Sequence, residues 1–189
     1  QVLSTQTVKN WEDQKSITKN IKQFDIKDLL ERQPIVIQNK LISKQIQNKT
    51  VLVTGAAGSI GSEIVQQVLA FEPAKIILVD QAETPLYELS LLVKTSLKNT
   101  TYIPFVADIK DAFIMEQILS NHQPDVIYHA AAYKHVPIME TNAYQAVLTN
   151  VLGTKILADL AIKYQVASFV MVSTDKAVNP TNVMGASKR

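Results

Sequence analysis

The stretch that decides the fold is Thr54-Gly55-Ala56-Ala57-Gly58-Ser59-Ile60-Gly61. It follows the apolar run Val51-Leu52-Val53 and opens a segment whose apolar residues recur at helical spacing. Glycines in such a strand–turn–helix context allow a tight turn, close approach of a pyrophosphate to the backbone, and close packing of helix on strand. The first N–H groups of the helix and its dipole favour phosphate charge. The loop therefore predicts a dinucleotide site contacted by Gly55, Gly58, Ser59, Ile60 and Gly61.

Short β-branched runs alternate with longer helical patterns from residue 50 onward. Strands that are apolar on both faces and separated by helices are typical of βαβ units and a parallel sheet. Right-handed crossovers then give an α/β fold, a Rossmann-type doubly wound parallel sheet with strand order 3-2-1-4-5. The predicted strands are 51–53, 76–79, 102–106, 126–128 and 168–172, and the predicted helices are about 60–71, 85–97, 112–121 and 143–164.

An acidic residue ends the second predicted strand. At the position of Asp80, a carboxylate accepts hydrogen bonds from the adenosine ribose and repels a 2′-phosphate. The alternative is an aspartate that caps the loop. With the glycines upstream the ribose role is favoured, and the pattern predicts NAD rather than NADP. Asp108 and Ile109, at the end of the third strand, are expected to border the adenine on position alone.

The segment after the fourth strand lies where ligands of such sheets bind, outside the carboxyl ends of strands one and four. There His129 is followed by three alanines and then by Tyr133, Lys134 and His135. Ala130 and Ala131 leave room for the cofactor. For His129, a packed structural histidine is at least as good an interpretation as a reactive one.

A polar cluster, Ser173-Thr174-Asp175-Lys176, ends the fifth strand. A hydroxyl, a carboxylate and an amine in succession can bond a sugar oxygen, give a proton and take a proton. The alternative is a turn that caps the next helix, which Asn179-Pro180-Thr181-Asn182 supports. Both interpretations can hold together.

Composition excludes several other classes of site. The 189 residues include no cysteine, so disulfides, thiolate catalysis and cysteine zinc sites are excluded. No two of the three histidines form a helical i, i+4 pair, and we expect no metal site. A net charge of +2 does not indicate nucleic-acid binding. With no signal-peptide pattern and no run of about 18 apolar residues, the chain as given is expected to be soluble and cytoplasmic.

The N-terminal part lacks the alternating pattern. Residues 1–49 are expected to form a linker with a short helical segment, and residues 50–189 an NAD-binding Rossmann domain. The helix is predicted over Ile21–Arg32, ending before Pro34, with a second short element over 35–46. A sheet of this kind usually has a sixth strand, so we expect a fragment truncated after the fifth strand, without its substrate domain.

Together these motifs resemble the extended short-chain dehydrogenase/reductases. More narrowly, they resemble the polysaccharide-biosynthesis nucleotide-sugar 4,6-dehydratases of the capsule and O-antigen type. The resemblance covers about residues 21–189, and Glu31 stands where that family more often has glycine. The motifs that carry it are Thr54–Gly61, Asp80, His129–Pro137, Asn150–Thr154, Ser173–Lys188 and DLLERQPI at 28–35, and Ser173–Arg189 is the most specific.

The resemblance implies an NAD-dependent lyase, a hydro-lyase that acts on a UDP-N-acetylhexosamine, most often UDP-N-acetylglucosamine. The sugar gives a hydride from carbon 4 to NAD, loses water across carbons 5 and 6, and regains the hydride at carbon 6. By position, Thr174 would contact the carbon-4 oxygen, Asp175 would protonate the departing hydroxyl, and Lys176 would remove the carbon-5 proton. Lys188 would hold the nicotinamide ribose, and the nicotinamide end would be lined by Asn150 and Lys134.

Met184 departs from the superfamily, whose acid/base tyrosine belongs at this position. A thioether cannot donate or accept a catalytic proton. The membrane-anchored branch of the dehydratases is similar in having methionine there. We hypothesise that the proton of the carbon-4 hydroxyl goes instead to Thr174 with Asp175. The branch also implies an N-terminal membrane region, a position on the cytoplasmic face of the bacterial inner membrane, and a homo-oligomer.

Two alternatives remain at this point. A nucleotide-sugar epimerase shares the cofactor site but need not expel water, and the adjacent Asp175 and Lys176 favour elimination over it. A non-catalytic NAD-binding scaffold or sensor is the other alternative, and Met184 is the best argument for it. For the 189 residues alone we expect NAD binding without turnover.

Overall fold

The computed structural model describes residues 3–4, 22–23, 39–96 and 100–189, and its contacts divide the chain into two units, 1–38 and 39–189. In the first unit, β1 (Leu3–Ser4) pairs antiparallel with β2 (Lys22–Gln23). The predicted helix over 21–32 is therefore wrong at Lys22 and Gln23, and its remainder lies outside the described residues. Helices shorter than about 12–15 residues are marginal without tertiary packing, so its periodicity was a weak guide.

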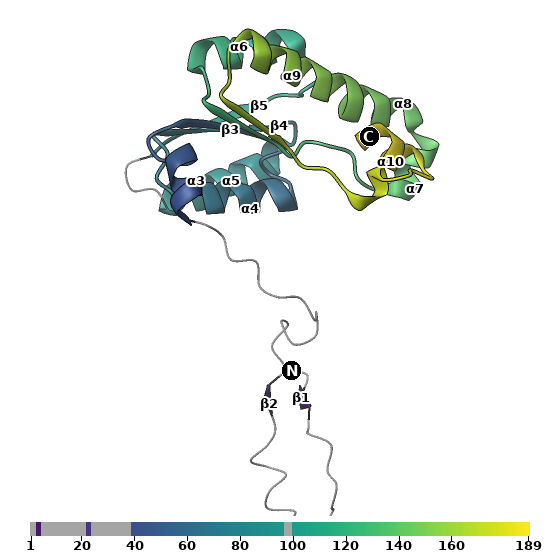
Figure 1. The fold of residues 1–189 in the computed structure, drawn as a ribbon, viewed down its shortest axis with the longest axis horizontal. Coiled ribbons are helices and arrows are strands. Elements are labelled where there is room, and N and C mark those ends of the chain that lie inside the picture. Colours follow the sequence, from purple (N-terminus) through teal and green to yellow (C-terminus); the bar gives the residue numbers. More distant parts are fainter. Residues whose placement is uncertain (1–2, 5–21, 24–38, 97–99) are drawn as a thin grey trace, which may run out of the picture. The chain divides into compact units, whose positions relative to one another are not determined.

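Five parallel strands form the centre of the second unit (Figure 1). They are β3 (Thr50–Thr54), β4 (Lys75–Asp80), β5 (Thr101–Val106), β6 (Val126–His129) and β7 (Ser168–Met171). Their order, β5-β4-β3-β6-β7, confirms the predicted 3-2-1-4-5 arrangement. The strand after β3 pairs with one edge of β3, and the chain later returns to pair β6 with the opposite edge of β3. The reversal lies between β3 and β6, which is where such sheets bind ligands.

Helices cover both faces of this sheet (Figure 1). Alternate residues of a strand point to opposite faces, and β3 shows this: Val51 and Val53 join one core cluster, and Leu52 joins the other. Val65 of α4 (Ser59–Leu69) packs in the first cluster. The first face carries α3 (Asn39–Ile46), α4 and α5 (Glu83–Ser96), and the second carries α6 (Ala112–His122) and α9 (Thr154–Lys163).

Helix α3 belongs to the sheet-containing unit. Its last residue, Ile46, is 1% exposed and packs in the same cluster as Val51. The sequence grouped this helix with the N-terminal segment because its pattern differs from the βαβ units that follow. Contacts place the division of the chain between Gln38 and Asn39.

The region predicted as one helix over 143–164 is built from three segments. These are α8 (Ala143–Ala146), the π-helical η1 (Val147–Gly153) and α9. The stretch Ala143–Lys163 has the length and mean hydropathy, 1.2, of a candidate membrane span among the described residues. Leu157 and Leu160 on it are buried against the sheet, whereas Val147, Val151 and Ile162 are exposed, so core packing accounts for only part of its apolar character. The remaining short helices are α7 (Val136–Thr141), η2 (Asp175–Ala177) and α10 (Val183–Lys188).

Candidate functional site

Two glycines of the loop, Gly55 and Gly61, have no room for a side chain. Gly55 has a φ of +65°, and a Cβ atom there would lie 2.5 Å from the amide nitrogen of Ala131. A Cβ at Gly61 would lie 1.9 Å from the carbonyl oxygen of Gly55, because α4 starts directly against the turn. Gly58 has more space, 3.3 Å to the same oxygen. The turn and the close helix packing expected of Gly55 and Gly61 are therefore present.

A cavity of about 330 Å³ lies beside this loop. It collects residues from the ends of β3, β4, β5 and β6, which meet at one edge of the parallel sheet. Most of the predicted cofactor residues line it. They are Gly55, Gly58, Asp80, Asp108, Ile109, Ala130 and Ala131.

Asp80 is held in the cavity wall by two backbone N–H groups. Its carboxylate oxygens accept one hydrogen bond each, from Ala57 and Ala82, both at 2.9 Å. This is the capping role considered from the sequence, and it ties the end of β4 to the glycine loop. A carboxylate has about four lone-pair sites, so the same group can still accept from a ligand.

Thr149 is a residue that the sequence analysis missed. It lies on η1, is 5% exposed, and lines the same cavity. Its hydroxyl has no hydrogen-bond partner within the described part of the chain. Leaving such a group unpaired costs about 1–3 kcal/mol, which a ligand in the cavity can offset by bonding it. The glycine loop beside the cavity and this unpaired hydroxyl both fit a dinucleotide.

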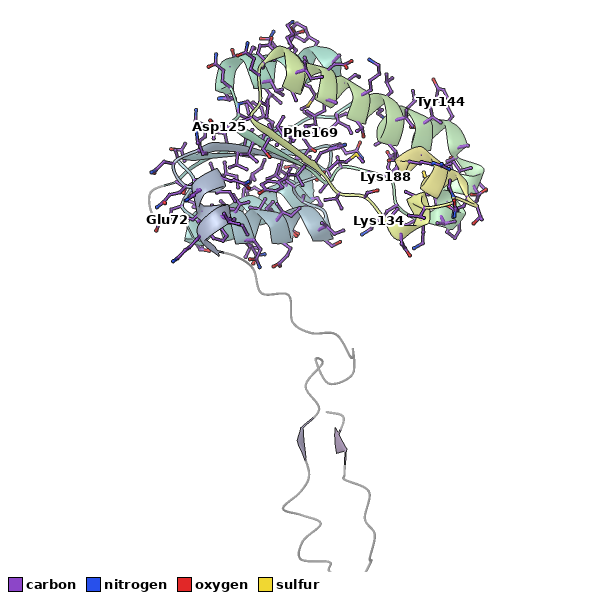
Figure 2. The ribbon with its side chains drawn as sticks, viewed as in Figure 1. Glu72, Asp125, Lys134, Tyr144, Phe169 and Lys188 are labelled. Carbon is purple, nitrogen blue, oxygen red and sulfur yellow. The ribbon has the colours of Figure 1, made fainter. Side chains whose placement is uncertain are left out.

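A second cavity, of about 280 Å³, adjoins the first, and the two share Ala130, Ala132 and Tyr133 in their walls. Lys134 and Lys188 lie at the same end of the sheet (Figure 2), and both line this cavity. The structure thus brings together residues from α4, the β6 loop, the β7 end and α10. The predicted site residues in its wall are Ile60, Ala130, Lys134, Thr174, Lys176, Met184 and Lys188.

The polar cluster after β7 forms a short turn. The Thr174 hydroxyl donates to an Asp175 carboxylate oxygen at 2.9 Å, and the Lys176 ammonium lies 3.5 Å from the same oxygen. The hydrogen bond from Thr174, and then the positive charge of Lys176, lower the pKa of Asp175. Its side chain is 88% exposed and does not line either cavity. Asp175 therefore lies beside the second cavity, and the other three residues of this cluster, Ser173, Thr174 and Lys176, line it.

Asn150 ties the β6 loop to α10. Its side-chain amide donates to the Tyr133 carbonyl at 2.9 Å and to the Ser187 hydroxyl at 2.8 Å, and its oxygen accepts from the Tyr133 N–H at 2.8 Å. It is buried and lines neither cavity. In this structure Asn150 acts on the site through Tyr133 and Ser187. Lys134 makes a similar tie, donating to the Ser59 hydroxyl at 3.2 Å.

His129 is fully buried between two threonines. Its Nδ1 lies 2.7 Å from the Thr54 hydroxyl, and its Nε2 lies 2.9 Å from the Thr154 hydroxyl. Burial, reinforced by the charge of Lys188, lowers the pKa of His129 to about 4. These contacts support the structural role for this histidine.

The sequence profile described as "Polysaccharide biosynthesis protein" matches residues 51–189, which is most of the chain. The chain belongs to that family. The chain is also similar to the capsular polysaccharide biosynthesis protein CapD of Staphylococcus aureus, with 47% identity over 171 residues. That match covers 90% of this chain and 28% of the relative.

Two further relatives carry activities in their names. A UDP-N-acetylglucosamine 4,6-dehydratase (inverting) of Campylobacter jejuni is 32% identical over 141 residues, covering 74% of this chain and 40% of the relative. A UDP-glucose 4-epimerase of Rickettsia canadensis is 33% identical over 145 residues, covering 75% and 41%. The chain thus spans less than half the length of each of these relatives.

A solved structure shares the fold of this chain. The dTDP-glucose 4,6-dehydratase DesIV from Streptomyces venezuelae, with NAD and TYD bound, superposes with a TM-score of 0.62 at 29% identity. The match covers 74% of this chain and 48% of DesIV. The Rossmann-type assignment from the sequence is confirmed.

Met184 gives this family member an apolar group in the wall of the second cavity. The side chain is 4% exposed and packs with Met139 and Ala146. Lys188, one helical turn later, is partly buried, and this burial lowers its pKa. Helix α10 thus supplies the Lys188 cation, and its Met184 offers no acid/base group.

Proposed function

We propose that the full-length protein is an NAD-dependent nucleotide-sugar 4,6-dehydratase, a lyase of surface-polysaccharide biosynthesis that acts on a UDP-N-acetylhexosamine such as UDP-N-acetylglucosamine. The observation that carries the proposal is the second cavity, where Thr174, Lys176 and Lys188 adjoin the dinucleotide cavity. Asp175 lies in the same turn. Elimination of water needs an acid and a base near one carbon–carbon bond, and this turn offers both.

The residues around the first cavity would hold NAD. The glycine loop and the start of α4 suit the pyrophosphate, Asp80 the adenosine ribose, and Asp108 with Ile109 the adenine. Thr149 offers its unpaired hydroxyl to the same molecule. NAD supplies a reversible hydride acceptor when bound. Lys188 and Lys134 are the cations available at the nicotinamide end.

The protein's own groups would move the protons of the elimination. Lys176, as the neutral amine, would take one proton from carbon 5. Asp175, once it holds the proton of the carbon-4 hydroxyl, would give that proton to the carbon-6 hydroxyl, which leaves as water. The lowered pKa of Asp175 opposes its role as an acid while the carboxylate is exposed. Burial beneath a bound sugar raises a carboxyl pKa, so substrate binding would favour the protonated form. Thr174 would bond the carbon-4 oxygen and, with Asp175, accept its proton in place of a tyrosine.

A nucleotide-sugar epimerase is the second candidate, and the Rickettsia canadensis relative favours it. Incubating the full-length protein with NAD and UDP-N-acetylglucosamine separates the two. A 4,6-dehydratase yields a product lighter by one water, and an epimerase yields an isomer of unchanged mass. A non-catalytic NAD-binding scaffold predicts no new UDP-sugar at all.

An Asp175→Asn variant of the full-length protein tests the role of the turn. We expect about 10²-fold or greater loss of dehydration, since general acid catalysis typically contributes 10²–10⁴-fold. Asp159→Asn, on the exposed surface of α9, is the matched control and should retain wild-type turnover. Unchanged turnover by the Asp175 variant would remove this residue from the mechanism.

We also propose that the full-length protein is a homo-oligomer anchored at the cytoplasmic face of the bacterial inner membrane. The support is the resemblance, at Met184, to the membrane-anchored dehydratases. Fractionation of cells that express the full-length protein tests the anchoring. Recovery in the soluble fraction without detergent would contradict it.

A further inference from the structure

Gly185 of α10 is pressed against the turn that carries Asp175 and Lys176. A Cβ atom at Gly185 would lie 2.2 Å from the carbonyl oxygen of Lys176 and 3.0 Å from its carbonyl carbon. Both atoms belong to the backbone, so no side-chain rotation can relieve the contact. Gly185 itself is buried. Helix α10, which carries Lys188, therefore lies so close to the η2 turn that only a glycine fits at position 185.

The helix has little freedom to move away. Its start is capped by the Asn182 side chain, which accepts from the Gly185 N–H at 2.7 Å. The Val183 N–H donates to a Glu140 carboxylate oxygen at 2.8 Å, which joins α10 to α7. Near its end, the Ser187 hydroxyl accepts from Asn150 at 2.8 Å. The bonds to Glu140 and Asn150 hold α10 to α7 and η1, while the contact at Gly185 limits how closely the helix approaches the turn.

We propose that Gly185 is a positioning residue that sets the separation between Lys176 on the turn and Lys188 on the helix. The inference rests on the proposed dehydratase function, in which the two lysines serve the same bound sugar and cofactor. Gly185 has no side chain and touches neither. It acts through the backbone of Lys176.

The size of the expected effect follows from the geometry. Ordinary contacts to a Cβ atom begin near 3.4 Å, so an alanine at Gly185 forces the turn and the helix apart by about 1 Å. A misplacement of about 1 Å can cost about 10²-fold in rate. The first cavity, proposed for the adenosine end of NAD, includes neither Gly185 nor Lys188, so the affinity for ADP, which lacks the nicotinamide ribose, should be kept.

The test compares Gly185→Ala with Ala186→Ser in the full-length protein. Each substitution adds one non-hydrogen atom, and Ala186 is exposed. For Gly185→Ala we expect kcat with UDP-N-acetylglucosamine to fall by about 10²-fold while the Kd for ADP stays within about twofold. The kinetic isotope effect with sugar deuterated at carbon 5 should rise, because proton removal by the displaced Lys176 becomes rate-limiting. Ala186→Ser should match the wild type in all three measurements.

Three results would overturn the inference. They are wild-type kcat in Gly185→Ala, a fall in kcat with an unchanged isotope effect, and a parallel loss of ADP binding, which indicates general destabilisation. A crystal structure of Gly185→Ala decides the positioning claim without any substrate. If Lys176 and Lys188 keep their wild-type separation in it, the inference fails. Absence of dehydration by the wild type would instead reject the proposed function, and that crystal structure would still decide the role of Gly185.

Discussion

At the residue scale, His129 shows how burial keeps an ionisable side chain uncharged at neutral pH. Its ring lies between the hydroxyls of Thr54 and Thr154, which join the start of the glycine loop to the start of α9. Both links can form with the neutral ring, since one nitrogen donates and the other accepts. The pKa of about 4 means that this state persists well below neutral pH.

The lowered pKa of His129 predicts a pH dependence of stability. An unfolded histidine titrates near 6.5, so between about pH 6.5 and pH 4 the unfolded chain binds more protons than the folded one. Stability is therefore intact above about pH 6.5 and declines as the pH falls toward 4, by up to about 3 kcal/mol from this residue. Urea denaturation across this range measures it.

Two variants isolate that effect. His129→Gln keeps a donor and an acceptor but cannot titrate, so its stability should decline less steeply than that of the wild type. His135→Gln, at an exposed position, should follow the wild-type curve. Equal slopes for all three proteins would show that His129 does not contribute.

The glycines of the loop predict different consequences for the same substitution. In Gly61→Ala the new Cβ would lie 1.9 Å from a backbone oxygen, so we expect the free energy of unfolding to fall by about 3 kcal/mol or more. Gly58→Ala, with 3.3 Å available, should change stability by about 1 kcal/mol or less. It should weaken NAD binding, because in such a loop the glycine at this position lets the pyrophosphate approach the backbone. Thermal unfolding and NAD titration of both variants check this. The reverse order of stability would contradict the packing described for α4.

At the element scale, the π-helical segment η1 determines which side chains reach the site. A π turn adds one residue to a helix turn and so changes the direction of the residues on it. Thr149 lines the dinucleotide cavity, and its neighbour Asn150 points to Tyr133 and Ser187. Helical periodicity predicted the helix correctly, but it contains no information about this local change of register, so Thr149 was not found.

The hydrogen bonds made by Asn150 predict a loss of stability when its side chain is truncated. Asn150→Ala leaves the backbone N–H and carbonyl of Tyr133 without partners, and we expect the free energy of unfolding to fall by about 2–3 kcal/mol. Asn142→Ala is the control and should cost about 1 kcal/mol or less, because Asn142 follows the end of α7 and its amide is exposed. Urea denaturation measures both. Similar losses in the two variants would mean that the Asn150 network adds nothing beyond a surface amide.

At the scale of the whole molecule, the two cavities form adjoining halves of one site along the carboxyl edge of the sheet. Ala130, Ala132 and Tyr133 form their common wall. The strands that end there are far apart in the chain but adjacent in the sheet. A dinucleotide lying across both cavities would contact β3, β4, β5, β6 and α10 together, and would therefore stabilise the unit as a whole.

This arrangement predicts that NAD raises the unfolding temperature. A ligand that binds only the folded state at 100 times its Kd adds about 2.7 kcal/mol of stability. NADP should raise the unfolding temperature less at the same concentration, because the Asp80 carboxylate would repel its 2′-phosphate. Thermal unfolding with each nucleotide tests this. Equal shifts with NAD and NADP would contradict the role given to Asp80.

The sequence by itself determined the parallel sheet, its strand order and the place of the dinucleotide loop. These depend on local patterns: apolar runs for buried strands, and glycines where backbone atoms meet. The tertiary structure decided which side chains share a cavity. It left Asp175 exposed beside the second cavity, pointed Asn150 at Tyr133, added Thr149 to the first cavity and pressed Gly185 against Lys176. The physical reason is that such contacts join residues distant in the chain, and their angstrom-scale distances depend on packing rather than on periodicity.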